Sequence, residues 1–406
     1  MRSLVIAVLC LWALSPGLGA VPAGVRVNGV SLVPLRPVAE RLGMKVKAFP
    51  PGTIILAKDA VVVRLTVNSA EALVNDRAVA LPTPVRRWNG QTYVPARLLA
   101  EVLDLGIAWD GTERAVRLTP DGGQPLAVPI LREKILFCTD RGDRGGNTVI
   151  CSVNPDGSDL QTLTDSAYHS GPPAVSPDGA VVAFIAEPGR LRGIYVMRPD
   201  GTGMRLLYAT DTARSPCYST DGRHLYYLTD NGLGRIDKHG KGQQGIPWRK
   251  LTKDAWDAES GEGPTALAAL RDGRLLVTVR LQKGGWSWEK LYRADFEGRT
   301  MTACLNKGEA DLFSPACTLD GTLLAVQRLT TGVDDTRLDL CVMHPDGTGV
   351  REVTGEGDEP AFSPDGLRLV FTRKMDLYLI NQDGTGLRQL TDTNAWESSP
   401  RWVFVR

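Results

Sequence analysis

The segment Pro360-Ala361-Phe362-Ser363-Pro364-Asp365-Gly366 decides the fold, because related segments recur along the last two thirds of the chain. Each copy has a proline, a few mostly apolar residues and a turn ending in Asp-Gly, and an apolar strand follows. Other copies begin at Pro173, Pro216 and Pro315, with a weaker one at 270–273. Glycine adopts the positive φ of tight turns without steric cost, and aspartate supports such turns by local hydrogen bonds. Every copy therefore predicts a strand, a tight turn and a second strand.

A second motif alternates with the first: a strand, another turn ending in glycine, and a strand closing in Leu-Thr or a similar pair. The segments 154–164, 344–354 and 382–391 show it most clearly. Six such second halves accompany five first halves. The missing first half is found at the C-terminus, at 399–405, and its continuation lies at 135–138. One unit is therefore split between the two ends of the repeat region.

Periods of about 40 to 50 residues with four short strands each are typical of a β-propeller. A blade cannot bury both of its faces alone, so the blades must pack in a closed ring. We therefore expect a mainly β protein with a six-bladed propeller at 133–406, in which the C-terminal strand completes the blade begun at 135–138. The Ser-Pro-Asp-Gly, Ile-Tyr-Val-Met (194–197), Asp-Gly-Thr-Gly and Leu-Thr segments resemble TolB-type, WD40-like propeller repeats. This resemblance implies the fold and leaves the role open, since such propellers serve several functions.

A different duplication occupies 21–120. The segment 33–42 (VPLRPVAERL) returns at 94–103 (VPARLLAEVL), and in both copies apolar residues follow the i, i+3, i+4, i+7 spacing of an amphipathic helix. Short β-like runs surround the helices, at 25–27, 53–56, 61–67, 72–74 and 115–118. The sequence predicts a small α+β module built twice, followed by a linker at 121–132.

The Val-Pro-Leu-Arg segment at 33–36 and the Trp109-Asp110 turn resemble the copper amine oxidase N-terminal-like domain. The resemblance implies a non-catalytic stalk that could contact cell-wall polymer. Copper amine oxidase chemistry needs a cofactor tyrosine in an Asn-Tyr-Asp or Asn-Tyr-Glu motif, and this chain has no Asn-Tyr pair. We expect no cofactor.

The N-terminus, 1–20, has a basic start, an apolar run at 4–14 and small residues before Ala20. An eleven-residue apolar run is too short to span a bilayer, so we interpret it as a secretory signal peptide, with a short buried helix or an uncleaved anchor as the alternative. Export to the periplasm, the cell surface or the medium follows, with no membrane span after cleavage. Lys plus Arg (47) balance Asp plus Glu (46), which argues against nucleic acid as a partner.

Six cysteines remain after the signal segment, and export would allow disulfides among them. Cys138 and Cys151 fall on neighbouring predicted strands and form the possible disulfide that we would test first. Buried thiols that never oxidise are the alternative. No cysteine spacing is typical of a zinc site.

The sequence gives only weak support for a calcium site or for a serine hydrolase. The Asp-Gly turns could suggest calcium, but each offers one carboxylate where calcium takes six to eight oxygen ligands, so we interpret their aspartates as turn residues. A serine hydrolase needs a Gly-x-Ser-x-Gly elbow, and the nearest candidate, 285–289 (GWSWE), lacks the second glycine. No metal site is predicted, and we expect a non-enzymatic binding or scaffold protein.

In a ring of blades, the loops that lead from each outer strand to the next inner strand converge at one channel mouth. These loops supply aromatic and charged side chains suited to a protein or cell-wall partner. The candidate binding residues are Tyr168, His169, Arg214, Glu262, Asp311, Phe313, Glu359, Trp396 and Glu397. One alternative is a hydrolase, lyase or lactonase that uses Glu262 and Asp311, with or without a metal. The other is a purely structural module; in each case we expect a monomer.

Overall fold

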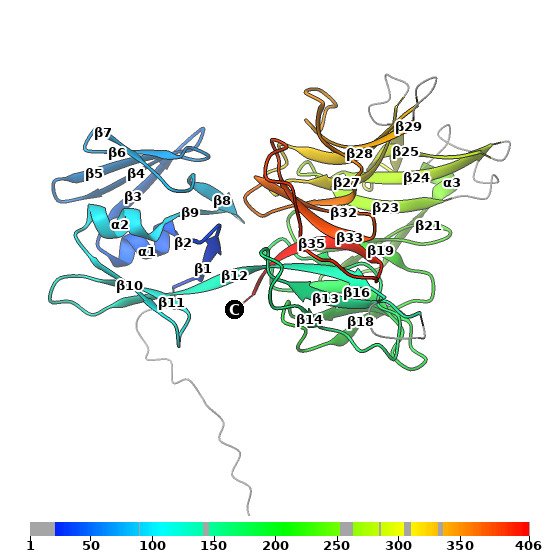
Figure 1. The fold of residues 1–406 in the computed structure, drawn as a ribbon, viewed down its shortest axis with the longest axis horizontal. Helices are drawn as coiled ribbons and strands as arrows, with labels where there is room; N and C mark the ends of the chain where they lie inside the picture. Colours follow the sequence, from blue (N-terminus) through cyan, green and yellow to red (C-terminus); the bar gives the residue numbers. More distant parts are fainter. Residues whose placement is uncertain are drawn as a thin grey trace, which may run out of the picture.

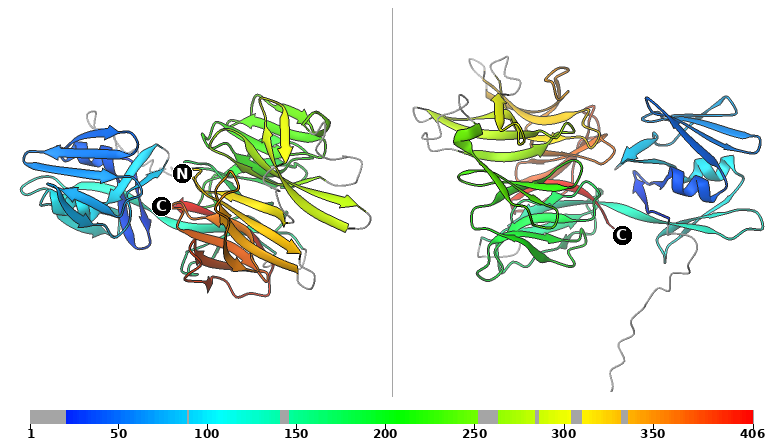
Figure 2. Two further views of the ribbon diagram at one scale, coloured as in Figure 1. Left: turned by 90° about the horizontal axis from the view of Figure 1, so that it is seen from above. Right: turned by 180° about the vertical axis from the view of Figure 1, so that it is seen from behind.

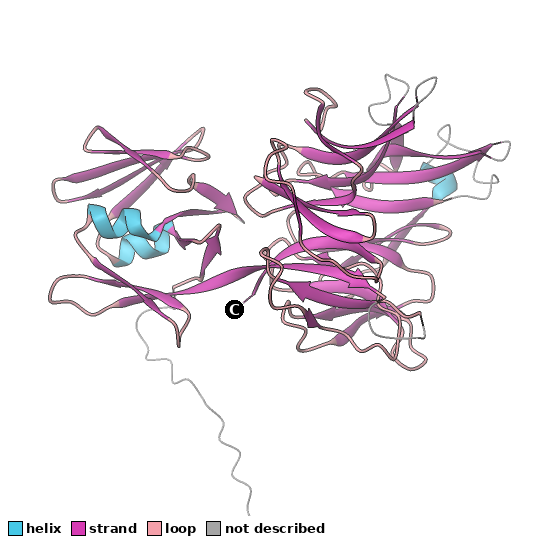
Figure 3. Cartoon of the chain, viewed as in Figure 1, coloured by secondary structure: helices cyan, strands magenta, loops and turns pink. Residues whose placement is uncertain are grey.

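The computed structural model describes residues 21–88, 90–140, 146–251, 263–283, 286–303, 310–331 and 336–405 (Figure 1). The predicted signal peptide lies outside these residues, as do Cys304 and Glu262. The described part divides into a small module and a larger assembly of four-stranded sheets, and strands dominate both (Figure 3).

The N-terminal module has two sheets with two helices between them (Figure 1). Its elements are β1 (Gly24–Val27), β2 (Val30–Pro34), α1 (Leu35–Arg41), β3 (Lys45–Phe49), β4 (Thr53–Lys58), β5 (Val61–Thr66), β6 (Glu71–Val74), β7 (Arg77–Ala80), β8 (Arg86–Trp88), β9 (Gln91–Pro95), α2 (Ala96–Val102), β10 (Gly106–Asp110) and β11 (Ala115–Thr119).

The predicted duplication is confirmed. Each copy is a strand pair, a short helix and a second strand pair, and the strands that precede the helices pair with each other, with Val33 opposite Val94. The apolar faces of α1 and α2 enter one core with both sheets, so Val38 and Leu99 are fully buried. The two helices therefore fold because they are covered on both sides, although each is only seven residues long.

A single long strand, β12 (Leu126–Thr139), joins the two parts (Figure 2). Its first half pairs with β11 and runs parallel to β1, and its second half belongs to the propeller. The linker predicted at 121–132 is therefore wrong beyond residue 125. A polar Gly-Pro stretch indicated a break, but the apolar residues after it continue both sheets.

The six predicted blades are present. Blade 1 contains β35 (Glu397–Val405), β12, β13 (Val149–Val153) and β14 (Gln161–Thr162). Blade 2 has β15 (Ala174–Val175), β16 (Val182–Ala186), β17 (Gly193–Met197) and β18 (Arg205–Ala209), and blade 3 has β19 (Arg214–Tyr218), β20 (His224–Leu228), β21 (Gly232–Asp237) and β22 (Gln244–Pro247), followed by α3 (Trp248–Leu251).

Blades 4 to 6 repeat this order. Blade 4 has β23 (Pro264–Ala269), β24 (Leu275–Lys283), β25 (Trp286–Asp295) and β26 (Thr300–Ala303), and blade 5 has β27 (Ala310–Cys317), β28 (Leu324–Thr331), β29 (Thr336–Met343) and β30 (Arg351–Gly355). Blade 6 has β31 (Asp358–Phe362), β32 (Arg368–Arg373), β33 (Asp376–Asn381) and β34 (Arg388–Gln389).

The ring closes as the split repeat predicts. The C-terminal strand β35 pairs antiparallel with β12, from Arg132 opposite Val405 to Thr139 opposite Glu397. Within the described residues, six apolar cores each join two neighbouring blades, including one between blades 6 and 1 that contains Phe137 and Trp402. Every blade thus buries both faces against its neighbours.

The possible Cys138–Cys151 disulfide is wrong. Cys138 lies opposite Ile150 and Cys151 lies opposite Phe137, so the two thiols point to opposite faces of blade 1. The Cys138 thiol enters the core shared with blade 2, and the Cys151 thiol enters the core shared with blade 6. Adjacent strands suggested proximity, but a register offset of one residue separates the side chains.

A buried ion pair lies at the junction between module and propeller. Arg368 Nη2 donates to Glu133 Oε1 at 2.7 Å, and both side chains are less than one tenth exposed. The backbone N–H of Asn28 also donates to this carboxylate, so Glu133 connects β12 to blade 6 and to the first turn of the module. Burial outweighs the nearby guanidinium and raises the pKa of Glu133 to about 7.

This ionisation predicts a pH-dependent stability. The pKa of Glu133 is higher in the folded protein (about 7) than its ordinary value of 4.5, so the folded state binds the proton more tightly. The resulting stabilisation is complete below about pH 4.5 and is lost as the pH rises through 7, by at most about 3 kcal/mol. Glu133→Gln removes this titration, so urea unfolding at pH 5 and pH 8 should show a smaller difference for the variant than for the wild type. An equal difference in both proteins would contradict the assignment.

Candidate functional site

The inner strands of the six blades line a central channel. Each inner strand contacts the inner strands of its two neighbours around the ring. All six run in one direction, so the channel has two different mouths. We call the end where these strands begin the loop mouth, and the end with the turns at 176–179, 219–222, 270–273, 318–321 and 363–366 the turn mouth.

A collar of hydrogen bonds encircles part of the loop mouth. Its serine donors precede a proline and adopt positive φ near 50°, and the strand register shifts next to each of them. Each bond joins the inner strands of neighbouring blades: Ser215 Oγ to Thr265 O at 3.0 Å, Ser314 Oγ to Asp358 Oδ1 at 2.8 Å, and Ser399 Oγ to Glu359 Oε1 at 3.1 Å. The collar holds the blades together at this end.

Two predicted binding residues prove to be structural. Glu359 accepts from both Ser399 N and Ser399 Oγ, and burial raises the pKa of its carboxyl above the usual range. Glu397 is fully buried, and Thr391 Oγ1 and Thr393 Oγ1 donate to its carboxylate. Neither carboxylate is presented to a partner. Both were expected in exposed loops, but Glu359 lies at the irregular start of β31 and Glu397 is the first residue of β35.

Two further predicted residues lie away from the channel. Tyr168 packs in the core between blades 1 and 2, where its hydroxyl contacts Met204 Sδ at 3.2 Å. His169 is exposed beside blade 1 and shares a hydrogen bond with Thr148 Oγ1 at 3.0 Å. Partial burial and the nearby Arg192 lower the pKa of His169.

The remaining predicted binding residues lie in different environments. Arg214 is paired with Asp230 at the loop mouth, and Phe313 is half-buried on β27. Asp311 lies on β27, but its side chain is not described, and Glu262 lies outside the described residues. The carboxylate-based enzyme alternative therefore stays a prediction. Elemental analysis of the purified protein would support it if a stoichiometric divalent metal were found.

Trp396 is the predicted residue that meets the requirements of a binding surface. Its side chain is 64% exposed, and its backbone N–H donates to Asp140 Oδ1 at 2.8 Å, which fixes the loop before β35. Met375, 55% exposed, lies close to it, because Glu397 N donates to Met375 O. The segments that carry these two exposed side chains are therefore joined at the loop mouth.

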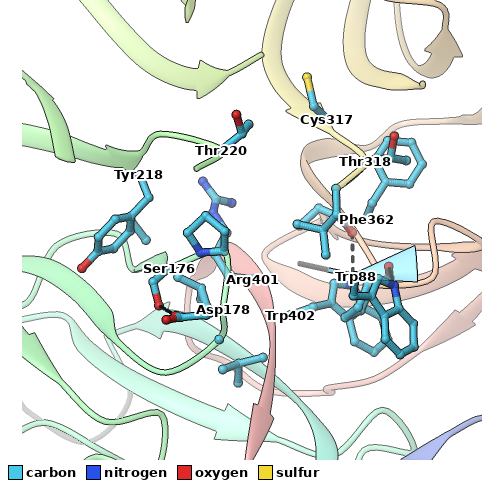
Figure 4. A pocket seen from close by; sticks show the side chains of 18 of the residues that line it. Trp88, Ser176, Asp178, Tyr218, Thr220, Cys317, Thr318, Phe362, Arg401 and Trp402 are labelled. Atoms are coloured by element: carbon cyan, nitrogen blue, oxygen red, sulfur yellow. Dashed lines mark hydrogen bonds between the residues drawn. The ribbon is translucent and has the colours of Figure 1, made fainter. Parts of the chain in front are cut away.

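The N-terminal module covers the turn mouth. Trp88 Nε1, at the end of β8, donates to Pro364 O in the turn of blade 6 at 2.6 Å, and the Trp88 ring packs against Tyr93 and Phe404. Between module and propeller lies a cavity of about 320 Å³, lined by inner-strand and turn residues of several blades (Figure 4). Its volume is at the lower end of the range typical of small-ligand sites.

The cavity contains little reactive chemistry. Burial raises the pKa of Cys217 to about 11 and that of Cys317 to about 12, so both thiols are protonated at neutral pH. Burial likewise raises the pKa of the Tyr218 phenol to about 12. Arg401 adds a cation to the lining. The lining therefore combines two protonated thiols and a protonated phenol with the Arg401 guanidinium.

The Asp-Gly turns confirm the turn interpretation. In each of four turns, an aspartate Oδ1 accepts the backbone N–H two residues later, at 2.9 Å. The four aspartates are Asp156, Asp200, Asp346 and Asp383. Among the residues that the structure describes, no cluster of three or more His, Cys, Asp or Glu could hold a metal.

Comparison with known proteins supports both parts of the architecture. Residues 20–118 match the family model described as "Copper amine oxidase N-terminal domain". The structure of TolB from Acinetobacter baumannii is similar over 89% of this chain and 82% of that chain, with 14% identity and a TM-score of 0.54. No curated protein matches the chain in sequence.

Two further solved structures share the fold. A chain of a nidogen/laminin complex is 12% identical over 67% of this chain and 98% of that chain, with a TM-score of 0.50. Hydrazine synthase of Kuenenia stuttgartiensis is 14% identical over 67% of this chain and 46% of that chain, also with a TM-score of 0.50. At such identities the similarity shows the propeller fold alone, so the function must be argued from the site.

Proposed function

We propose that this protein is an exported, non-enzymatic binding protein of the cell envelope, which receives a protein or cell-wall partner at the loop mouth of its propeller. The exposed Trp396 carries this proposal. An indole that is 64% exposed has apolar surface available to a partner, and tryptophan is among the residues that contribute most to binding energy. The turn mouth is occupied by the module, which leaves the loop mouth as the accessible end of the channel.

The charged groups near this mouth support binding rather than catalysis. Glu359 and Glu397 are engaged in the ring, and Arg214 is paired with Asp230. A general acid or base must reach its substrate with an available oxygen or nitrogen, and each of these groups is already engaged within the ring. They fix the shape of the mouth around Trp396.

Export is part of the proposal and rests on the signal-like segment at 1–20. Among the described residues, no helix combines the length and the apolarity that a bilayer span requires. The module could then contact the cell wall while the propeller holds its partner.

Trp396→Ala tests the proposal. Loss of a central aromatic anchor at an interface typically costs about 2 kcal/mol, equivalent to about 30-fold in affinity. Partners retained by the immobilised wild type from a native envelope extract should be reduced accordingly on the variant, as measured by quantitative mass spectrometry.

Trp109→Ala is the matched control, because Trp109 is 41% exposed on the module. It should leave the retained proteins unchanged. If Trp396→Ala retained every partner, or if Trp109→Ala lost them instead, the loop mouth would not be the binding surface.

A further inference from the structure

The cavity at the turn mouth has an excess of positive charge. Its charged lining residues are Arg401, Arg87 and Asp178. The Asp178 Oδ1 atom already accepts from Ser176 Oγ at 2.6 Å and from Ala180 N at 3.0 Å, as part of its turn. Two positively charged guanidinium groups therefore line the cavity with one carboxylate, and one oxygen of that carboxylate already accepts two hydrogen bonds.

Arg401 has spare hydrogen-bonding capacity. Its Nη1 donates to Pro400 O at 2.8 Å, and although its charge acts on the Glu359 carboxyl, no ion pair joins the two among the described residues. A guanidinium has five N–H donors in a planar fork that fits a carboxylate bidentately. Arg401 lies on β35 and lines the cavity together with side chains from several blades (Figure 4).

The rest of the lining is largely apolar and aromatic. Trp88 and Tyr93 of the module face the cavity from one side, and Phe362 and Leu267 line it from the propeller. Its volume of about 320 Å³ lies at the lower end of the range of small-ligand sites. The space therefore suits a compact ligand with an apolar body and one anionic group.

We infer that this cavity is a binding site for a small organic monocarboxylate, with the carboxylate on Arg401 and the apolar body against the aromatic side chains of the module and the propeller. The site is separate from the loop mouth and does not depend on the partner proposed there. Because module and propeller both line it, the bound anion would also strengthen the contact between them.

Benzoate is a suitable probe, and benzyl alcohol is its neutral counterpart. Calorimetry on the full chain should show saturable benzoate binding in the millimolar range and much weaker binding of benzyl alcohol. Arg401→Gln should reduce benzoate affinity about 10-fold or more, since hydrogen bonds to charged groups are worth more than neutral ones. Arg401→Lys should retain part of the affinity. Arg97→Gln, an equal charge change at an exposed position of α2, should bind like the wild type.

A second measurement needs no variant. Cys217 and Cys317 line the cavity and are only partly buried, whereas Cys341 is buried elsewhere. Benzoate should slow the modification of Cys217 and Cys317 by a small uncharged thiol reagent and leave the rate at Cys341 unchanged. Absence of both binding and protection in the wild type would overturn the site. Equal binding of benzoate and benzyl alcohol, or undiminished benzoate binding by folded Arg401→Gln, would overturn the anion assignment.

Discussion

Removal of residues 401–406 is expected to destabilise the propeller severely. The truncation deletes five of the residue pairs that join β35 to β12, from Leu136 opposite Arg401 to Arg132 opposite Val405. It also removes Trp402 and Val403 from the two cores on either side of blade 1. The loss exceeds about 5 kcal/mol, which corresponds to a fall of about 10 °C or more in melting temperature, or to failure to fold.

Calorimetry and far-UV circular dichroism of the truncated protein measure this effect. Removal of Arg406 alone is the control and should change the melting temperature little, because the residues that pair with β12 remain. A truncated protein that melted at the wild-type temperature would show that the ring does not depend on its C-terminal strand.

Trp402→Ala is expected to lower the free energy of unfolding by about 3–5 kcal/mol. The Trp402 side chain is 7% exposed, and its Nε1 donates to Ala361 O at 3.2 Å. The Arg368 guanidinium lies over its ring, 4.7 Å from the centroid. Alanine would leave a cavity between blades 6 and 1, remove the hydrogen bond, and expose one face of the buried guanidinium that holds Glu133.

Denaturant unfolding monitored by circular dichroism measures this loss. Trp396→Ala provides the comparison within the same segment, because its exposed side chain should change stability by less than about 0.5 kcal/mol. If the two substitutions lowered the free energy of unfolding equally, the difference in burial between Trp402 and Trp396 would be contradicted. Trp402 therefore reports on closure of the ring and Trp396 on the surface of the loop mouth.

The repeat region was predictable because its turn chemistry and its strand pattern repeat together. Asp365-Gly366 and its equivalents mark the turns, and the split unit places β35 beside β12 without any knowledge of the structure. The duplicated helices were predictable for the same reason, since 33–42 and 94–103 share one apolar spacing. Boundaries were less predictable: β12 continues through the expected linker, because its apolar residues serve the module first and blade 1 afterwards.

Site residues were harder to predict than the fold. Sequence places Glu359 and Glu397 in loops, but whether a loop carboxylate faces solvent or a neighbouring blade depends on bulges that only the packed ring determines. The residues of the turn-mouth cavity were missed altogether, because Arg401 lies in a strand and Trp88 in a different domain. The sequence offered one signal for the collar, which is the residue that precedes the proline of an inner strand, such as Ser399.

Hydroxyl-radical footprinting of the intact protein tests most directly whether the two channel mouths differ as described. Trp396, 64% exposed at the loop mouth, should be oxidised rapidly, while Trp88, 7% exposed at the contact between module and propeller, should be protected along with Trp402. Fast oxidation of Trp396 with slow oxidation of Trp88 is the predicted result. Oxidation of Trp88 as fast as that of Trp396, in protein that still unfolds cooperatively, would show that the turn mouth is open and would contradict the difference between the two mouths.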